Sequence, residues 1–344
     1  MRAVRLHGLP NDTRVDDIPS PEMNSNSVLV HLSAATICAN DWKMAVKGSR
    51  GVDLPTTLGH ELAGVVDEVG SNVKGYKPGD RVCIRFAGAI YCGHCFYCLR
   101  GLHHLCENWI YYPQPAGWVE KMIFDSRLDE RLLPMADQVS FEAGALVEPL
   151  ACSLAGVEQA QVQYGEEVVI LGAGAMGLFC LELSLLAGAA RVIVVDTVPG
   201  RLKIAQELGA QNVVDFKAGD PVEAVKNLTK GRGAASVIEC SGSLAGAAQA
   251  VKMARKHGTV VWFAGLPTPA DLQLDANLIH YSAINLTGSS GSSIRHSHKI
   301  LGYLETGRLN YEPIITHHFH FDQAKEALDL AASQSQALKI VLEP

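Results

Sequence analysis

Four cysteines lie within fifteen positions, and no other feature limits so strongly what this chain can fold into. They are Cys92, Cys95, Cys98 and Cys106, spaced as Cys-x2-Cys-x2-Cys-x7-Cys. Thiolates at this density can surround one zinc ion tetrahedrally, whereas free thiols in a loop need no such spacing. Because four protein ligands leave no open coordination position, the pattern predicts a structural zinc that fastens a lobe and takes no part in chemistry.

Length and cysteine count set the wider frame. The chain has 344 residues, enough for about two domains. Its nine cysteines are an odd number, and a chain of this length does not need disulfides to hold a core, so a reducing compartment is favoured. Residues 1–15 carry charges throughout and lack the apolar region of a signal peptide. We therefore expect a cytoplasmic protein.

Charge and hydropathy exclude two classes of partner. The net charge is -7, and no cluster of lysines and arginines is long enough to form a nucleic-acid-binding face. No uncharged apolar stretch reaches the roughly 18 residues that a membrane span requires. We expect neither a nucleic acid nor a membrane as a partner.

The two halves of the chain differ in the secondary structure that their sequences predict. Roughly the first 150 residues hold short β-like runs such as Val28–Leu32, Gly64–Val69 and Arg81–Arg85, which predict a β-rich domain. From Gly165 onward apolar strands alternate with helical stretches, which predicts a doubly wound parallel sheet. The expected strands are residues 168–171, 191–196, 213–215, 236–239, 259–263 and 284–287, and the expected helices include 176–186, 201–208 and 245–252. The predicted domains are 1–152 with 291–344, and 153–290.

A glycine-rich run follows the first of these strands and precedes a helix. Its glycines allow a tight turn and a close approach of the backbone to a pyrophosphate, and the helix N-terminus adds N–H groups and partial positive charge. Asp196 ends the next strand, where a carboxylate binds ribose hydroxyls and repels a 2′-phosphate, which favours NAD over NADP. Arg201 would lie over the adenine or tolerate part of such a phosphate. The candidate cofactor residues here are Gly172, Gly174, Met176, Gly177, Asp196 and Arg201.

A second group of possible metal ligands is scattered along the chain. It comprises Cys38, the pair His60-Glu61, and Glu148. A catalytic zinc takes about three protein ligands of mixed type and keeps one position for water or substrate. Spacing alone supports this group only weakly, because a buried histidine beside a glutamate is more often structural than a ligand.

The residues around this group resemble a known family. Gly59–Val66, followed by Val69-Gly70, is similar to the signature of the zinc-containing medium-chain alcohol dehydrogenases, and Lys77–Val82 resembles that family's next block. Leu146–Ala151 and the closing Leu338–Pro344 resemble the sorbitol/L-iditol (polyol) dehydrogenase branch of this family. Ethanol-type members of the family carry a cysteine at the position of Glu148. With the four-cysteine lobe and the glycine run, the resemblance covers nearly the whole chain.

The resemblance implies a fold, a ligand set and two zinc ions per chain. The fold is α/β, with a GroES-like β-rich catalytic domain that carries the four-cysteine zinc lobe, and a Rossmann domain that binds NAD. Cys38 and His60 would bind the catalytic zinc, Glu61 would be a direct or exchangeable ligand, and Glu148 would take the remaining position directly or through a water. Lys339 would reach the pyrophosphate. The family also implies a homodimer or homotetramer. The last strand of the Rossmann domain could pair with the same strand of a second subunit.

The chain departs from the family at the positions that relay the alcohol proton. Many members read Cys-Gly-Ser/Thr-Asp-x-His, whereas this chain reads Cys38-Ala39-Asn40-Asp41-Trp42-Lys43. Asn40 has no hydroxyl to pass a proton, and Lys43 stands in place of the histidine. In one interpretation the proton leaves through water with Glu61 or Glu148, and Asn40 holds the substrate or the ribose. In the other the relay is impaired. We favour the first.

These features predict an oxidoreductase that transfers a hydride from a secondary alcohol of a polyol, cyclitol or sugar to NAD, and that reduces the ketone in reverse. Alternatives within the class are an L-threonine 3-dehydrogenase-like enzyme and a simple secondary-alcohol dehydrogenase. A different alternative is a non-catalytic NAD-binding protein that keeps only the structural zinc. Metal content separates the last from the others, because the enzyme would hold about two zinc ions per chain and the scaffold about one.

Overall fold

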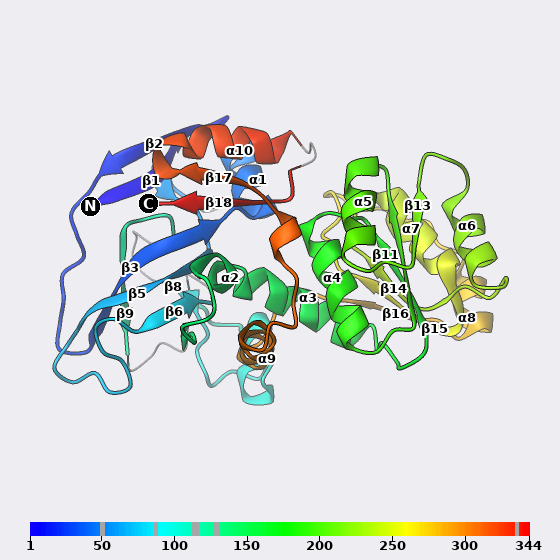
Figure 1. Cartoon of the computed structure of the whole chain (residues 1–344), viewed down its shortest axis with the longest axis horizontal. Coiled ribbons are helices and arrows are strands. Elements are labelled where there is room, and N and C mark those ends of the chain that lie inside the picture. The colour runs from blue at the N-terminus through cyan, green and yellow to red at the C-terminus, as the bar shows by residue number, and fades with distance from the viewer. Residues whose placement is uncertain (49–51, 86–88, 112–116, 127–130, 334–336) are drawn as a thin grey trace. The chain divides into compact units, whose positions relative to one another are not determined.

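The chain folds into two compact units in the computed structural model, which describes residues 1–48, 52–85, 89–111, 117–126, 131–333 and 337–344 (Figure 1). One unit comprises Met1–Ala151, Ser293–Arg308 and Ile315–Pro344, and the other comprises Cys152–Ser292 and Leu309–Ile314. The predicted boundaries lie one or two residues from these. Residues 309–314 were predicted as part of the first domain, but they pack with the second unit.

The first unit is built on a mainly antiparallel sheet of seven strands. Its strands are, in order, β10 (Leu132–Pro134), β6 (Arg81–Ile84), β5 (Glu61–Val69), β3 (Ser27–Thr36), β18 (Lys339–Glu343) and β17 (Ile315–His320), with β9 (Lys121–Asp125) also paired to β3. A second sheet holds β2 (Asp12–Asp17), β1 (Arg2–Gly8) and β4 (Thr56–Thr57). Because β18 pairs with β3, the end of the chain completes a sheet that its beginning forms.

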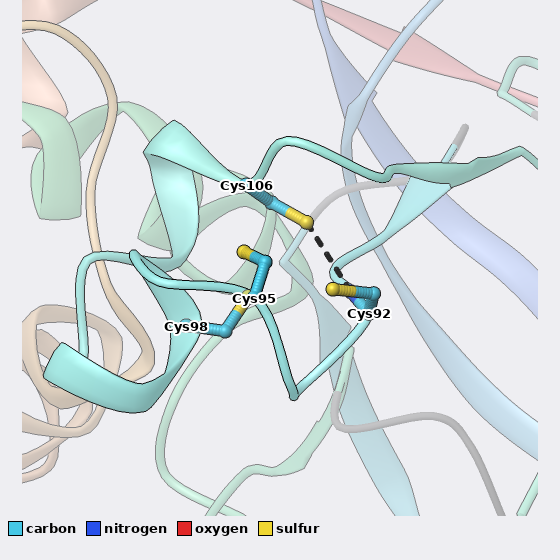
Figure 2. A group of neighbouring side chains, drawn as sticks. All are labelled: Cys92, Cys95, Cys98 and Cys106. Atoms are coloured by element: carbon cyan, nitrogen blue, oxygen red, sulfur yellow. Dashed lines mark hydrogen bonds between the residues drawn. The ribbon is translucent and has the colours of Figure 1, made fainter.

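Short helices and a lobe surround these sheets. The helices are α1 (Ala39–Lys47), α2 (Phe141–Ala145), α9 (Ile294–Glu305), α10 (Ala324–Ala332) and the 3₁₀ turn η4 (Phe321–Gln323), while α3 (Val147–Gln159) crosses the boundary between the units. The lobe lies between β7 (Ala89–Ile90) and β8 (Ile110–Tyr111), which pair with each other, and contains η1 (Cys98–Arg100) and η2 (His103–Leu105). Figure 2 shows that its four cysteines lie together.

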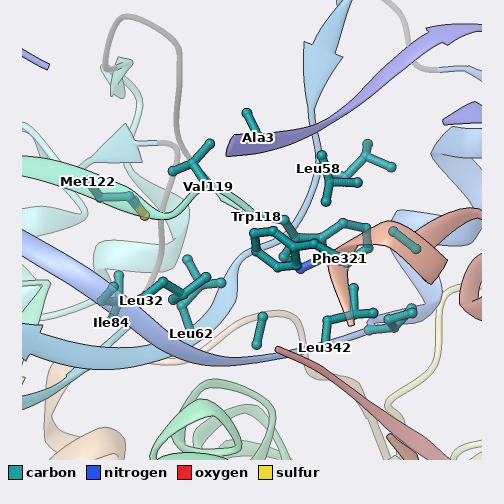
Figure 3. Packing of buried hydrophobic residues seen from close by; sticks show 14 of the residues in the cluster. Ala3, Leu32, Leu58, Leu62, Ile84, Trp118, Val119, Met122, Phe321 and Leu342 are labelled. Carbon is teal, nitrogen blue, oxygen red and sulfur yellow. The ribbon is translucent and has the colours of Figure 1, made fainter. Parts of the chain in front are cut away.

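The core of the first unit packs apolar side chains around Trp118, which is fully buried. Figure 3 shows Trp118 close to Leu58 and Phe321. Gly59 has a φ of +96°, and a Cβ there would lie 2.2 Å from Trp118 Nε1. Only glycine fits this position. Because Gly59 directly precedes His60, its packing against Trp118 fixes the backbone position from which the candidate ligands His60 and Glu61 follow.

The second unit is a parallel sheet of six strands with helices between them. The strand order is β13 (Asn212–Asp215), β12 (Arg191–Asp196), β11 (Glu167–Leu171), β14 (Ala234–Glu239), β15 (Ala254–Trp262) and β16 (Asn285–Gly288). The connecting elements are α4 (Ala175–Leu186), α5 (Pro199–Glu207), α6 (Pro221–Leu228), α7 (Leu244–Met253), α8 (Ala276–Ser282) and, from the later segment, η3 (Glu312–Ile314). The order reverses between β11 and β14, as in the doubly wound dinucleotide-binding fold.

The α/β fold class predicted from the sequence is confirmed. All six predicted strands of the second unit are present, and β12 has the predicted ends. β15 begins five residues earlier than predicted, because its first part follows α7 directly as extended chain. Among the residues described, none of the helices combines the length and the apolar composition that a bilayer crossing requires.

Candidate metal and cofactor sites

The four-cysteine cluster forms a closed set of sulfur ligands. The sulfur atoms of Cys92, Cys95, Cys98 and Cys106 all lie within 4.8 Å of one another (Figure 2). The lobe folds so that backbone N–H groups also point at these sulfurs: Cys92 N and Asn108 N donate to Cys106 Sγ at 3.3 and 3.4 Å. Hydrogen bonds from the backbone at Glu107 and Cys98 help to lower the pKa of Cys95 to about 6. Four converging sulfurs, one of them on a cysteine with a lowered pKa, fit a structural zinc.

The second group comes together through strand register. Thr36 at the end of β3 lies opposite Glu61 at the start of β5. Cys38 and His60, which lie just beyond these paired strand ends, are therefore at the same end of the two strands. Ligand atoms of Cys38, His60 and Glu61 lie within 4.8 Å of one another. The structure thus unites three residues that sequence spacing left scattered, and they make a mixed thiolate, imidazole and carboxylate set of the kind that a catalytic zinc takes.

Asp41 orients two of these ligands. Its side chain is buried, accepts a hydrogen bond from Cys38 N at 2.8 Å, and lies 3.3 Å from His60 Nδ1. A carboxylate on one ring nitrogen fixes the imidazole and leaves Nε2 to face a metal. Burial by itself lowers the pKa of His60, but Asp41 and Cys38 together raise it well above its ordinary value. Asp41 is the third residue of α1 and its carboxylate bonds back to the N-cap residue Cys38, so the capping of this helix places the carboxylate beside the ligands.

Glu61 is fully buried and is neutralised by a lysine from the far end of the chain. Lys339 Nζ donates to both of its oxygens, at 2.6 and 2.5 Å, and the Thr36 hydroxyl donates to Oε2. In this structure the amine of Lys339 is buried beside the candidate metal ligands, and its contact with a pyrophosphate stays a prediction. Burial lowers the pKa of Lys339, but Glu61, Cys38 and Glu148 outweigh this effect and raise it.

The remaining predicted residues of this site lie on two helices. Glu148 is in the first turn of α3 and acts electrostatically on Lys339, but it is outside the group of three whose ligand atoms converge. Its role as the remaining ligand stays a prediction. Asn40 and Lys43 are exposed on α1, and Lys43 Nζ lies 5.8 Å from the ring centroid of Trp42. Neither side chain contributes to the ligand group.

The electrostatic balance of the second group suits a divalent cation. Cys38, Asp41 and Glu61 bring three acidic groups to the site, and Lys339 supplies one compensating positive charge. Burial raises the pKa of the Cys38 thiol and Asp41 helps to raise that of His60, so both residues would lose a proton to a bound divalent ion, and the ion would then balance the negative charge of the thiolate and the carboxylates. Sequence reasoning missed Thr36 as a partner of the site, although its place two residues before Cys38 was visible in the sequence.

The glycine turn is shaped to receive a dinucleotide phosphate. A Cβ on Gly177 would lie 1.8 Å from Gly172 O, whereas a Cβ on Gly174 would meet nothing within 4 Å. The close approach of Gly172 and Gly177 therefore keeps the turn tight, and Gly174 at the N-cap of α4 leaves open space at the helix N-terminus. Asp196 accepts hydrogen bonds from Ala173 N at 2.5 Å and Val198 N at 2.8 Å.

The structure places the other two cofactor residues on helices next to this turn. Met176 is half-buried in the first turn of α4, and Arg201 is half-buried on α5, directly after the strand that Asp196 ends. Asp196 thus ties the glycine turn to the loop that leads to Arg201. The contact of either side chain with a nucleotide stays a prediction.

Comparison with known proteins places the chain in a family. Residues 24–136 match the alcohol dehydrogenase GroES-like domain, and residues 175–305 match the zinc-binding dehydrogenase domain. The chain is 32% identical to a sorbitol dehydrogenase of Bombyx mori, over 99% of this chain and 97% of the relative. It is 30% identical to an NAD-dependent alcohol dehydrogenase of Sulfurisphaera tokodaii, over 96% of each. The structure of alcohol dehydrogenase TADH from Thermus sp. ATN1 superimposes with a TM-score of 0.88 at 27% identity, over 100% of this chain and 99% of the other.

The chain therefore belongs to the zinc-containing medium-chain alcohol dehydrogenases, in the branch that resembles sorbitol dehydrogenase. It is an alcohol dehydrogenase that uses zinc and NAD.

Proposed function

We propose that this enzyme oxidises a secondary alcohol of a polyol, cyclitol or sugar to the ketone with NAD, and catalyses the reverse reduction. The observation that carries the proposal is the convergence of Cys38, His60 and Glu61 beside a buried lysine. The similarity to sorbitol dehydrogenases from several organisms supports a hydroxyl-rich substrate. Exposed polar side chains at Asn40 and Lys43 next to the ligand Cys38 agree with this class.

Cys38 and His60 would hold the catalytic zinc, with Glu61 as a direct or exchangeable ligand and Glu148 in the remaining position. When bound, zinc polarises the substrate hydroxyl as a Lewis acid, and NAD accepts the hydride. Asp41 keeps the imidazole of His60 in one orientation through Nδ1. Lys339 and Thr36 hold the Glu61 carboxylate in place, so the ligand geometry is set before substrate arrives.

The proton of the alcohol needs a path that does not depend on a hydroxyl at position 40. Asn40 can donate and accept hydrogen bonds but cannot relay a proton. We assign the transfer to water that contacts Glu61, which belongs to the ligand group, or Glu148, which acts electrostatically on Lys339 beside that group. Asn40 then binds a substrate hydroxyl or the ribose.

NADH formation, followed by absorbance with zinc-replete protein, tests the proposal. The substrates are sorbitol, xylitol, L-iditol, galactitol, myo-inositol, an amino-cyclitol, L-threonine and 2-butanol, each with NAD and with NADP. We expect turnover of a polyol or cyclitol with NAD and much less with NADP. Turnover of 2-butanol or L-threonine alone would contradict the substrate class, and a preference for NADP would contradict the role of Asp196.

We also propose a cytoplasmic homodimer or homotetramer. β16 is the last strand of the parallel sheet, so one of its edges has no strand partner in the described part of the chain. Such an edge is a ready surface for pairing with a second copy. Light scattering on the purified protein should give a mass of two or four chains, and a monomer at micromolar concentration would contradict the assembly.

A further inference from the structure

A buried carboxyl group lies at the end of a central strand of the parallel sheet, and no lysine, arginine or histidine among the described residues forms an ion pair with it. Glu239 is the last residue of β14 and is fully buried. Its Oε1 accepts hydrogen bonds from Ser241 N at 2.8 Å, Gly242 N at 3.1 Å and the Ser241 hydroxyl. Oε2 is buried and has no hydrogen-bond partner in the part of the chain that the structure describes. Burying a carboxyl oxygen without a partner costs free energy, and we therefore asked which part of the structure Glu239 holds in place.

What Glu239 holds is the turn that leaves the sheet after β14. Three donors converge on one carboxyl oxygen, so the turn at residues 241–242 has little freedom to move. Burial raises the pKa of Glu239, and the hydrogen bonds from Ser241 act in the opposite direction. The turn leads directly into α7, whose N-cap Ser243 accepts a hydrogen bond from Gly246 N at 2.9 Å.

This turn touches the glycine turn that follows β11. A Cβ on Gly172 would lie 2.8 Å from Ser241 N, and Cys240 N donates to Leu171 O at 2.7 Å. Gly172 also has a φ of +104°, a backbone conformation that favours glycine, so a side chain there would be strained as well as crowded. The two turns are therefore packed backbone to backbone, and a displacement of one would change the shape of the other.

The contact between the two turns lies where the strand order of the sheet reverses. β11 and β14 are the neighbours at which the strand order reverses, and a dinucleotide binds across the carboxyl ends of the strands at such a point. Asp196 lies on β12, on the adenosine side of β11. The turn after β14 lies on the other side, where the second mononucleotide half of the cofactor binds.

We infer that Glu239 is a positioning residue of the cofactor site, which holds the turn of Ser241 and Gly242 against Gly172 as the wall on the nicotinamide side. It acts through this turn and does not touch the reacting atoms. The inference rests only on the dinucleotide part of the proposed function. It is tested by binding, so an error in the alcohol substrate would leave it standing.

Calorimetric titration of the zinc-loaded full chain with NADH and, separately, with AMP tests the inference. Glu239→Leu removes all three acceptor contacts, and we expect the Kd for NADH to rise at least about tenfold, since each lost hydrogen bond is worth roughly 1 kcal/mol. AMP needs only the side of Asp196, so its Kd should stay within about threefold. Glu239→Gln keeps an acceptor in place and should stay within about threefold for both ligands.

Ser241→Ala is the milder variant, because it removes one hydroxyl donor and leaves the core intact. We expect its Kd for NADH to rise about threefold to tenfold, with AMP binding unchanged. An equal loss of NADH and AMP affinity in Glu239→Leu would show a general structural role and overturn the inference. If Glu239→Leu does not fold, an unchanged NADH affinity in Ser241→Ala would overturn it.

Discussion

The two metal sites of this protein are assembled in different ways. The four-cysteine site takes all its ligands from fifteen consecutive residues of one lobe, Cys92–Cys106, whereas the second site joins the ends of β3 and β5. Around the first lie aromatic side chains of the same lobe, Tyr91, Tyr97 and Trp109, and backbone N–H groups that donate to Cys106 Sγ. The second has a buried carboxylate, a hydroxyl and a lysine behind its ligands. The comparison teaches that a structural site can be local, while a reactive site needs the fold to position groups that adjust it.

Loss of a ligand in the second site should have the largest effect on activity. His60→Ala removes a ligand that Asp41 orients, and we expect NADH formation to fall at least about 1000-fold, or about 4 kcal/mol in the barrier. The variant should still fold and bind NADH, because the glycine turn lies in the other unit. Retention of more than a tenth of the activity would show that the catalytic centre is elsewhere.

Loss of Lys339 should chiefly reduce stability. Lys339→Met leaves the fully buried Glu61 without its cation, and breaking such a pair costs about 3–5 kcal/mol. The double variant Glu61→Gln/Lys339→Met removes both charges and should recover most of the loss. Urea unfolding of the three proteins measures the effect. A single variant as stable as the parent would contradict the view that this pair is what permits a carboxylate to be buried there.

Glu182 on α4 is the opposite case, a buried carboxylate that has no cation partner among the contacts of the described residues. Burial raises its pKa to about 7, and Asn310 N donates to Oε1 at 2.9 Å. The folded state therefore holds the proton more tightly than the unfolded state, so this group's contribution to stability falls as pH rises from about 5 to about 7.

Glu182→Gln removes this titration and keeps an acceptor for Asn310. We expect its stability relative to the parent to improve by about 2 kcal/mol between pH 5 and pH 8, since one unit of pKa is worth about 1.4 kcal/mol. Urea unfolding at the two pH values measures the difference. A difference that does not change with pH would contradict a raised pKa for Glu182.

The smallest effect is expected at Asn40. If the proton leaves through water and a glutamate, Asn40→Ser should change kcat by less than about tenfold, or about 1.4 kcal/mol. A much larger gain would show that the native chain has an impaired relay and that the hydroxyl restores it. Asn40→Ala serves as the matched control, because it removes hydrogen bonding without adding a hydroxyl.

How far the sequence predicts each site follows from how local its parts are. The spacing of Cys92 to Cys106 predicts the closed site, and the order of strand, glycine turn and helix predicts the Rossmann sheet. The second site needed a family resemblance, because the register of β3 against β5 cannot be derived from spacing. The contact of Lys339 with Glu61 was not predicted, since only the fold brings together two residues that are 278 positions apart. Glu239 was missed because the role inferred for it depends on the contact of Ser241 with Gly172, which only the fold defines.

The zinc content of the protein and of two ligand variants tests the central claim most directly. Elemental analysis should give about two zinc ions per chain in the parent, and about one in both His60→Ala and Cys98→Ser. Only His60→Ala should keep the lobe's zinc and the parent's thermal stability while losing NADH formation. One zinc ion per chain in the parent, or two in His60→Ala, would contradict the account of one structural and one catalytic site.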